Sequence, residues 1–268
     1  MKRLIESLTA SALARVNRVP ERMTEPECIR QLIGKLAPVV PNQELIRLGP
    51  VGDGGYLVPD DIEGIEACFS PGVSFISGFE TDCAARNMKV FLADRSVDGP
   101  AETNELFSFT KHFIGAFQDE GFLTLDGWVA DSVASKDSDL MLQIDIEGFE
   151  YEVFLSATEE LMKRFRVIVV EFHELDKLFR HSFFRFASRA IEKLLSTHTC
   201  VHIHPNNVFP PVEHHGIVIP PLLEMTFVRN DRIPQNPTFA TDFPHPLDTP
   251  CTENPELTLP SCWQGTPK

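Results

Sequence analysis

The chain has 268 residues, with 24 basic and 39 acidic side chains and a formal charge of −15 at pH 7. Its hydrophobic content of 43% and charged content of 24% are ordinary globular values and argue against a wholly disordered chain or a coiled coil. The negative charge would repel a phosphate backbone, so a nucleic-acid partner is not expected. The length predicts one large domain, or one domain with appendages.

Targeting signals are not evident in the sequence. No apolar run approaches the ~20 residues that a membrane span needs, and residues 1–6 are followed by no apolar stretch typical of a signal peptide. The six cysteines are scattered and form no C-x-x-C pair, which is typical of free thiols in a reducing compartment. We therefore expect a cytoplasmic protein without a membrane span.

The charge is concentrated in one part of the chain. Residues 61–160 contain 5 basic and 21 acidic side chains, whereas residues 1–40 contain 7 basic and 4 acidic ones. A ligand of this central region is therefore expected to be neutral or cationic.

The first elements in chain order are two helices, which the spacing of apolar residues predicts over 2–17 and 25–37. Pro26 lies near the start of the second helix, and Pro38 and Pro41 end it. These helices form an expected N-terminal helical extension over 1–44. The D-G turn in 52–58 then predicts a β-hairpin. Alternatively, this segment is a flap over a cofactor, with Asp53 or Tyr56 touching it.

The region 45–230 alternates short apolar runs with helical patterns, which is typical of a mostly parallel α/β sheet. Strands are predicted at 65–70, 89–93, 140–144, 167–170, 200–203 and 223–228, with a weak one near 107–114. Helices are predicted at 78–87, 148–163 and 182–198. The last of these has a strong apolar face, which we assign to the core.

Two segments differ from this pattern. Prolines in 205–221, among them Pro205, Pro210, Pro211 and Pro220, are expected to interrupt regular structure in a substrate-facing insertion. The adjacent pair of histidines in this loop, at 214–215, is expected on the surface. The tail over 231–268 contains eight prolines and predicts an extended or partly disordered segment.

Polar residues follow several predicted strands at their carboxyl ends, where ligands bind in sheets of this class. The segments that follow the strands are 70–74, Asp94, 145–148, 171–173 and 204–207. Four of these ends bring an acid or a histidine to one crevice. The set predicts a binding site there.

A dinucleotide and S-adenosylmethionine are the two candidate cofactors for this crevice. Asp94 follows Gly72 by 22 residues, close to the spacing of a ribose-binding acid, but the turn lacks the G-x-G-x-x-G pattern of dinucleotide sites. No phosphate-binding G-x-x-x-x-G-K-[ST] loop is present either. S-adenosylmethionine (SAM) needs the same ribose contact, has no phosphates and carries a cationic sulfonium. An acidic crevice therefore favours SAM, with a helix N-cap as the alternative role of Asp94.

The run from Leu142 to Val153, which contains D-x-E-G-x-E, resembles the signature of the FkbM-type methyltransferases. The segments 69–73, 79–80, 124–128, 168–173 and 202–207 agree with it, so the resemblance covers roughly 45–230. Ser70 stands where many SAM enzymes have an acid on the first loop, and Glu80 is able to compensate from the following helix. The resemblance implies a SAM-binding domain over 45–230.

What the resemblance implies further is a Rossmann-like, seven-stranded methyltransferase sheet, mostly parallel with an antiparallel last strand and helices on both faces. It also implies methyl transfer from SAM to a hydroxyl group of a sugar or secondary metabolite. The expected partner is thus a small-molecule or glycan acceptor. The expected cofactor-binding residues are Ser70, Gly72, Ser74, Glu80, Asp94, Asp145 and Glu147.

O-methylation requires a base for the hydroxyl proton, or a metal that lowers the pKa of the hydroxyl. His173 and His204 follow predicted strands and are the candidate bases, with a structural role as the alternative for each. Asp145 and Glu171 complete the expected catalytic set. Together with Glu147 they are able to orient the base, to hold a divalent cation through oxygen ligands, or simply to cap local structure.

Two alternative functions stay open at the level of sequence. A non-catalytic binding protein with this fold is consistent with Ser70 in place of the usual acid. A metal-dependent hydrolase would use the acids and histidines of the same crevice.

Overall fold

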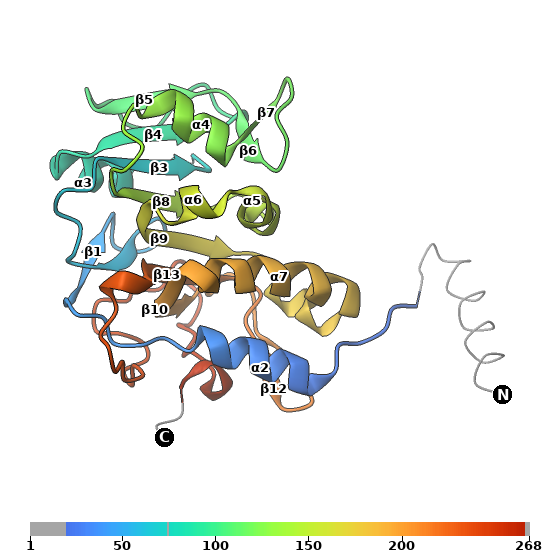
Figure 1. Ribbon diagram of the computed structural model, residues 1–268. Helices are drawn as coiled ribbons and strands as arrows, with labels where there is room; N and C mark the ends of the chain where they lie inside the picture. Colours follow the sequence, from blue (N-terminus) through green and yellow to red (C-terminus); the bar gives the residue numbers. More distant parts are fainter. Residues whose placement is uncertain (1–19, 74, 266–268) are drawn as a thin grey trace.

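The computed structural model describes residues 20–73 and 75–265 (Figure 1). The helix predicted over 2–17 and the predicted site residue Ser74 lie outside this part of the chain. None of the helices within it is long and apolar enough to cross a membrane.

A seven-stranded sheet organises the fold, in the order β10-β13-β9-β8-β3-β4-β5 (Figure 1). The strands from β5 to β9 are paired in parallel, and β13 is antiparallel to both of its neighbours. The predicted Rossmann-like methyltransferase sheet, with its antiparallel last strand, is therefore confirmed. The strands are β3 (Ala67–Pro71), β4 (Lys89–Ala93), β5 (Phe107–Thr110), β8 (Leu140–Ile144), β9 (Phe165–Phe172), β10 (His198–Pro205) and β13 (Leu223–Arg229).

Alternate side chains of the strands bury into two different apolar layers, because successive residues of a strand point to opposite faces. On β8, Leu140 and Leu142 belong to the larger cluster and Met141 to the smaller one. Helices contribute to both layers, as expected for such a sheet. They are α2 (Pro26–Leu36), α4 (Leu125–Ser132), α5 (Glu150–Ser156), α6 (Glu159–Met162) and α7 (His181–Thr197) in the larger layer, and α3 (Gly78–Ala85) in the smaller.

The single helix predicted over 148–163 is wrong in one respect, since it is divided into α5 and α6. The Thr158 side chain accepts a hydrogen bond from the backbone N–H of Leu161 and so caps α6. The Asp126 carboxylate accepts the backbone N–H of Thr158 at 3.0 Å. A new helix therefore starts at this point instead of a continuation.

Three small two-stranded sheets accompany the main sheet in the described chain. The hairpin predicted at 52–58 is confirmed, with β1 (Leu45–Leu48) antiparallel to β2 (Tyr56–Pro59). The weak strand predicted near 107–114 is two strands, β5 and β6 (Phe113–Gly115), and β6 pairs in parallel with β7 (Phe122–Thr124).

The expectation that prolines interrupt 205–221 is wrong for its middle part. The hairpin of β11 (Val212–His214) and β12 (Ile217–Ile219) occupies it, and Pro210, Pro211 and Pro220 lie outside the two strands. The two histidines at the turn of this hairpin are exposed, as expected.

The C-terminal tail contains little regular structure besides the short helices η2 (Asn230–Arg232) and η3 (Ser261–Trp263). It packs closely on the body of the protein, because Leu259 and Trp263 are buried in the larger apolar layer. The Trp263 indole donates a hydrogen bond of 3.0 Å to the backbone carbonyl of Val218 on β12. The tail is therefore a structural part of the core rather than a loose extension.

Candidate functional site

Two cavities open at the carboxyl edge of the sheet and share a common wall. The acidic pocket, of about 410 Å³, is lined by residues from 53–56, α3, β9 and the tail. The apolar pocket, of about 620 Å³, lies over the ends of β4, β6 and β7. Gly72, Asp145 and Glu147 line both cavities, so the two form one continuous crevice. The crevice expected at the strand ends is thus present.

The apolar pocket carries a carboxylate beside its aromatic walls. Asp94 follows directly after β4, and its Oδ1 accepts hydrogen bonds of 2.6 Å from the backbone N–H and the hydroxyl of Ser96. No helix begins there within the described chain, so the helix N-cap alternative for Asp94 is wrong. The apolar side chains of the pocket are Val73, Phe75, Ala93, Val97, Phe113, Ile114, Phe122, Ile146 and Phe149.

Gly72 joins the two cavities because its backbone touches the loop that follows β8. It has a φ of +97°, and a Cβ atom at this position would lie 1.6 Å from the carbonyl oxygen of Asp145. Any larger residue would push apart the loops that follow β3 and β8.

The predicted replacement of a first-loop acid by Glu80 agrees with the geometry. The Ser70 hydroxyl lies 2.5 Å from Glu80 Oε1 and 2.7 Å from Gln143 Oε1. The amide of Gln143 in turn donates to the Tyr56 hydroxyl at 3.4 Å. Burial raises the pKa of Glu80, although the bond from Ser70 opposes this effect. The carboxylate of α3 therefore lies where the end of β3 supplies only a hydroxyl.

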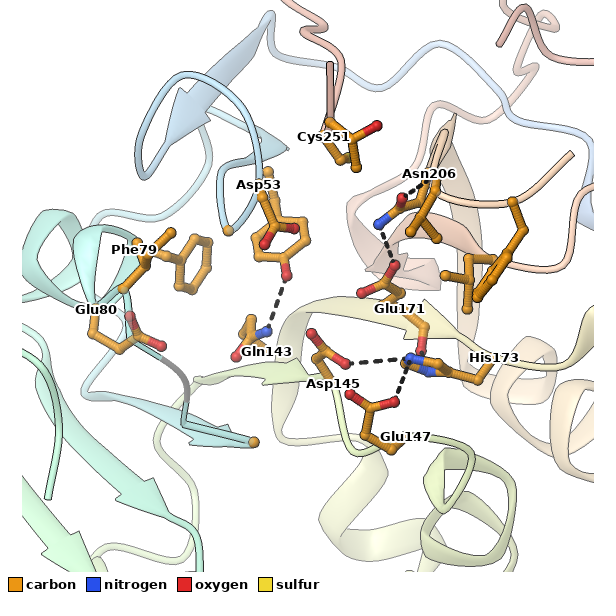
Figure 2. Close-up of a pocket in the computed structure, with 18 residues that line it drawn as sticks. Asp53, Phe79, Glu80, Gln143, Asp145, Glu147, Glu171, His173, Asn206 and Cys251 are labelled. Atoms are coloured by element: carbon orange, nitrogen blue, oxygen red, sulfur yellow. Dashed lines mark hydrogen bonds and ion pairs between the residues drawn. The ribbon is translucent and has the colours of Figure 1, made fainter. Parts of the chain in front are cut away.

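In the part of the chain that the structure describes, no lysine or arginine lines the acidic pocket, whereas five carboxylates do so: Asp53, Glu80, Asp145, Glu147 and Glu171 (Figure 2). Burial raises the pKa of Asp145 to about 6, although His173 opposes this shift. The pKa of Glu171 is also raised, first by burial and then by the charge of Asp145. Asn206 donates a hydrogen bond of 2.8 Å to Glu171. The pocket thus has a strong preference for positive charge.

His173 lies at one side of this acidic set, beside Asp145 and Glu147 (Figure 2). Its Nδ1 is 3.0 Å from Glu150 Oε1, and its Nε2 is 3.5 Å from Glu147 and 3.7 Å from Asp145. Burial lowers the pKa of His173, but the bond to Glu150 and the surrounding charges raise it overall. The ring therefore presents Nε2 to the crevice while a buried carboxylate holds Nδ1.

The structure does not bring His204 together with His173. β10 continues to Pro205, beyond the predicted end at 203, so His204 lies inside the strand. It is buried, its Nδ1 is 2.8 Å from Glu224 Oε2, and it lines neither of the two cavities. As a candidate base its placement is unfavourable, in contrast to that of His173.

Sequence reasoning missed two residues of the site. Glu150 is fully buried and accepts hydrogen bonds from the backbone N–H groups of Ile146 and Gly148 as well as holding His173. The sequence did contain an indication of Glu150, because this residue is the last acid of the D-x-E-G-x-E motif. Cys251 lines the acidic pocket from the tail. No local pattern indicated that a proline-rich tail would reach the crevice.

Metal-ligating side chains meet at two places in the described chain. Asp145, Glu147 and His173 form one group, and His204, Glu224 and Cys251 form the other. In each group the ligand atoms lie within 4.8 Å of one another. The first group lies in the crevice and contains two of the three carboxylates that were expected to hold a divalent cation, Asp145 and Glu147 but not Glu171.

The comparison with protein families agrees with the sequence motifs. Residues 99–197 match the model described as the methyltransferase FkbM domain. The matched segment contains D-x-E-G-x-E and His173, whereas Gly72 and Asp94 precede it. No curated protein matches the chain significantly. The resemblance to the FkbM-type methyltransferase family is therefore confirmed.

Proposed function

We propose that this FkbM-type methyltransferase takes its methyl group from SAM and transfers it to a hydroxyl oxygen of a small molecule or glycan. The observation that carries the proposal is the crevice itself. A largely apolar pocket, in which Asp94 is the one carboxylate not shared, adjoins across Gly72, Asp145 and Glu147 a pocket that five carboxylates and, among the described residues, no lysine or arginine line. A nucleoside with a cationic end matches this arrangement, because its base fits the apolar pocket and its positive charge fits the acidic pocket.

The apolar pocket suits the adenosine part of SAM. Aromatic side chains such as Phe113 and Phe122 offer stacking surfaces for a base. Asp94 is half-buried at the end of β4 and offers a carboxylate acceptor for the two ribose hydroxyl groups. A pyrophosphate would meet no compensating lysine or arginine among the lining residues of either cavity.

The acidic pocket suits the charged end of SAM. When bound, SAM supplies an activated methyl group on a sulfonium sulfur. Glu80 and Gln143 line this pocket and would hold the ammonium group of the methionine part, while the fully buried Ser70, which lines neither cavity, joins them through its hydroxyl. The carboxylates of Asp145 and Glu147 lie at the junction of both cavities, where they favour positive charge.

His173 is the residue that we assign as the base. Its Nε2 faces the crevice, and the raised pKa makes the ring a better proton acceptor than a free histidine. Glu150 fixes the ring through Nδ1 and stabilises the charged imidazolium that forms after proton uptake. Glu171 and Asn206 line the far side of the pocket and are positioned to orient an acceptor hydroxyl. The chain thus positions the acceptor and removes its proton.

Calorimetric titration with SAM tests the assignment of the cofactor. Asp94→Ala should weaken SAM binding by about 1–3 kcal/mol, because a hydrogen-bonded charged partner of the ribose is lost. The matched control is Asp98→Ala, in the same loop, whose side chain is 97% exposed. Equal affinity of both variants and the wild type would remove Asp94 from the cofactor site.

An acceptor screen tests the reaction. Glycans and hydroxylated metabolites are incubated with the protein and SAM, and formation of S-adenosylhomocysteine is measured. With an active acceptor, His173→Ala should bind SAM normally while its turnover falls by about 10²–10⁴. Glu150→Gln should shift the pH profile of turnover, since this residue acts through the ring. Full turnover in His173→Ala would exclude His173 as the base.

A further inference from the structure

A second group of metal ligands lies behind the wall of the acidic pocket, where the tail crosses two strands. His204 of β10 and Glu224 of β13 are direct partners in the antiparallel register. His204 Nδ1 is 2.8 Å from Glu224 Oε2, and Cys251 Sγ is 3.3 Å from Glu224 Oε1. Three different kinds of ligand atom, from three separate segments, therefore meet at one point.

The distances are close to those of an assembled site. Zinc binds imidazole nitrogen and carboxylate oxygen at about 2.0–2.2 Å and thiolate sulfur at about 2.3 Å. Tetrahedral geometry at these bond lengths separates neighbouring ligand atoms by roughly 3.3–3.6 Å. The observed separations of 2.8 and 3.3 Å are to the two different oxygens of Glu224, and one ligand atom from each of the three residues lies within 4.8 Å of the other two.

The His204 ring is itself the cationic partner of Glu224, at 2.8 Å, and the other charges that act most strongly on His204 and Cys251 are acidic. The negative charges nearest in effect to His204 are those of Glu224, Asp248 and Glu256. For Cys251 they are those of Glu224, Glu171 and Asp53. No lysine or arginine takes part in the hydrogen bonds that the structure describes for His204, Glu224 or Cys251. Buried carboxylates normally have a cationic partner or a metal.

The second nitrogen of the His204 ring lacks a partner within the described chain. His204 is 4% exposed, and its Nε2 has no hydrogen-bond partner among the described residues. Buried polar atoms of side chains are nearly always satisfied, so each exception needs an explanation. This atom is not the ring nitrogen that faces Glu224, so an ion bound at Nδ1 would leave Nε2 to another partner such as a water molecule.

We propose that His204, Glu224 and Cys251 bind a divalent ion of the zinc class and thereby fix the tail to strands β10 and β13. The combination of imidazole, carboxylate and thiolate selects such an ion over magnesium or calcium, which prefer oxygen ligands alone. Because Cys251 also lines the acidic pocket, the ion holds one wall of the crevice in place. The proposal does not depend on methyl transfer.

Cobalt(II) is the probe, since a cobalt–thiolate bond gives a charge-transfer absorption band that carboxylate and imidazole ligands do not give. Chelator-treated full-length protein is titrated with cobalt. The expected result is a thiolate band that saturates at one equivalent and disappears on addition of zinc. The group of Asp145, Glu147 and His173 has no thiol and cannot produce this band.

Variants identify the ligands. Cys251→Ser should abolish the band, and Glu224→Gln should weaken cobalt binding at least tenfold while the band is retained at saturation. The matched control is Cys262→Ser, since Cys262 is half-buried in the same tail and bonds only to the Val218 carbonyl. Circular dichroism confirms that each variant is folded. Absence of the band in the wild type, its persistence in Cys251→Ser or its loss in Cys262→Ser would each overturn the proposal.

Discussion

Asp145 provides a quantitative test of the electrostatics of the crevice. Its side chain is 29% exposed, and burial raises its pKa from 3.8 to about 6. Below the lower value both the folded and unfolded states bind the proton, and above the higher value both have released it. Between them only the folded state retains it, so stability falls as the pH rises through this window.

The size of the effect follows from the shift. A difference of about two pKa units corresponds to about 3 kcal/mol at neutral pH. Because Asp145 interacts with Glu171 and is partly exposed, we expect about 1–3 kcal/mol in practice. Asp145→Asn removes the charge, so its stability relative to the wild type should improve by this amount between about pH 4 and pH 8.

Urea unfolding at the two pH values measures this difference. The exposed loop variant Asp137→Asn is the control and should show no comparable change with pH. If the stability of Asp145→Asn relative to the wild type is the same at both pH values, the carboxylate is not penalised by the folded state, and the reasoning is refuted.

Three further predictions concern the core and its pH dependence. Trp263→Ala should lower the free energy of unfolding by about 3–5 kcal/mol in urea titrations, because this side chain is fully buried, whereas a loose tail would give almost no change. Burial lowers the pKa of His198 from 6.5 to about 4, although its bond to the Phe165 carbonyl opposes this. The neutral ring stabilises the fold at high pH, so wild-type stability should decline by up to about 3 kcal/mol as the pH falls through this window. His198→Gln should flatten that decline in the same assay, and an unchanged slope would contradict the assignment. Arg166→Met should lower the free energy of unfolding, measured by thermal unfolding, by about 3 kcal/mol, because the carboxylate of Asp139 loses one of its two arginine partners. A decrease below about 0.5 kcal/mol would mean that this ion pair contributes little to stability.

The main sheet could be predicted because its strands are short apolar runs that end at polar residues. The range predicted for β8, 140–144, agrees with the structure, and so does that for β4. Two strands, β9 in the interior of the sheet and β10 at its edge, were predicted too short. β10 and β9 extend through polar or charged residues such as His204 and Glu171, which are buried by cross-strand partners that no local pattern reveals.

The helices show the same limit. The apolar face of α7 was visible in the sequence and fixed its position closely. The division between α5 and α6 depends on Asp126, which lies 32 residues before Thr158 and bonds to its backbone. Such a distant cap cannot be recognised from local periodicity.

The candidate site was predictable at the carboxyl ends of parallel strands and much less so elsewhere. Asp94, Asp145, Glu171 and His173 were identified because topology brings strand ends together. Cys251 was missed because its position depends on how the tail packs in three dimensions. The predicted domain boundaries, at 44/45 and 230/231, stay predictions.

The central claim is that the crevice binds SAM across both cavities. The most direct measurement is a crystal structure of the protein with S-adenosylhomocysteine. We expect the ribose hydroxyl groups on Asp94, the base in the apolar pocket and the sulfur near Gly72, facing the acidic pocket. Crystals grown with saturating ligand that show the nucleoside outside this crevice, or no bound nucleoside at all, would contradict the account.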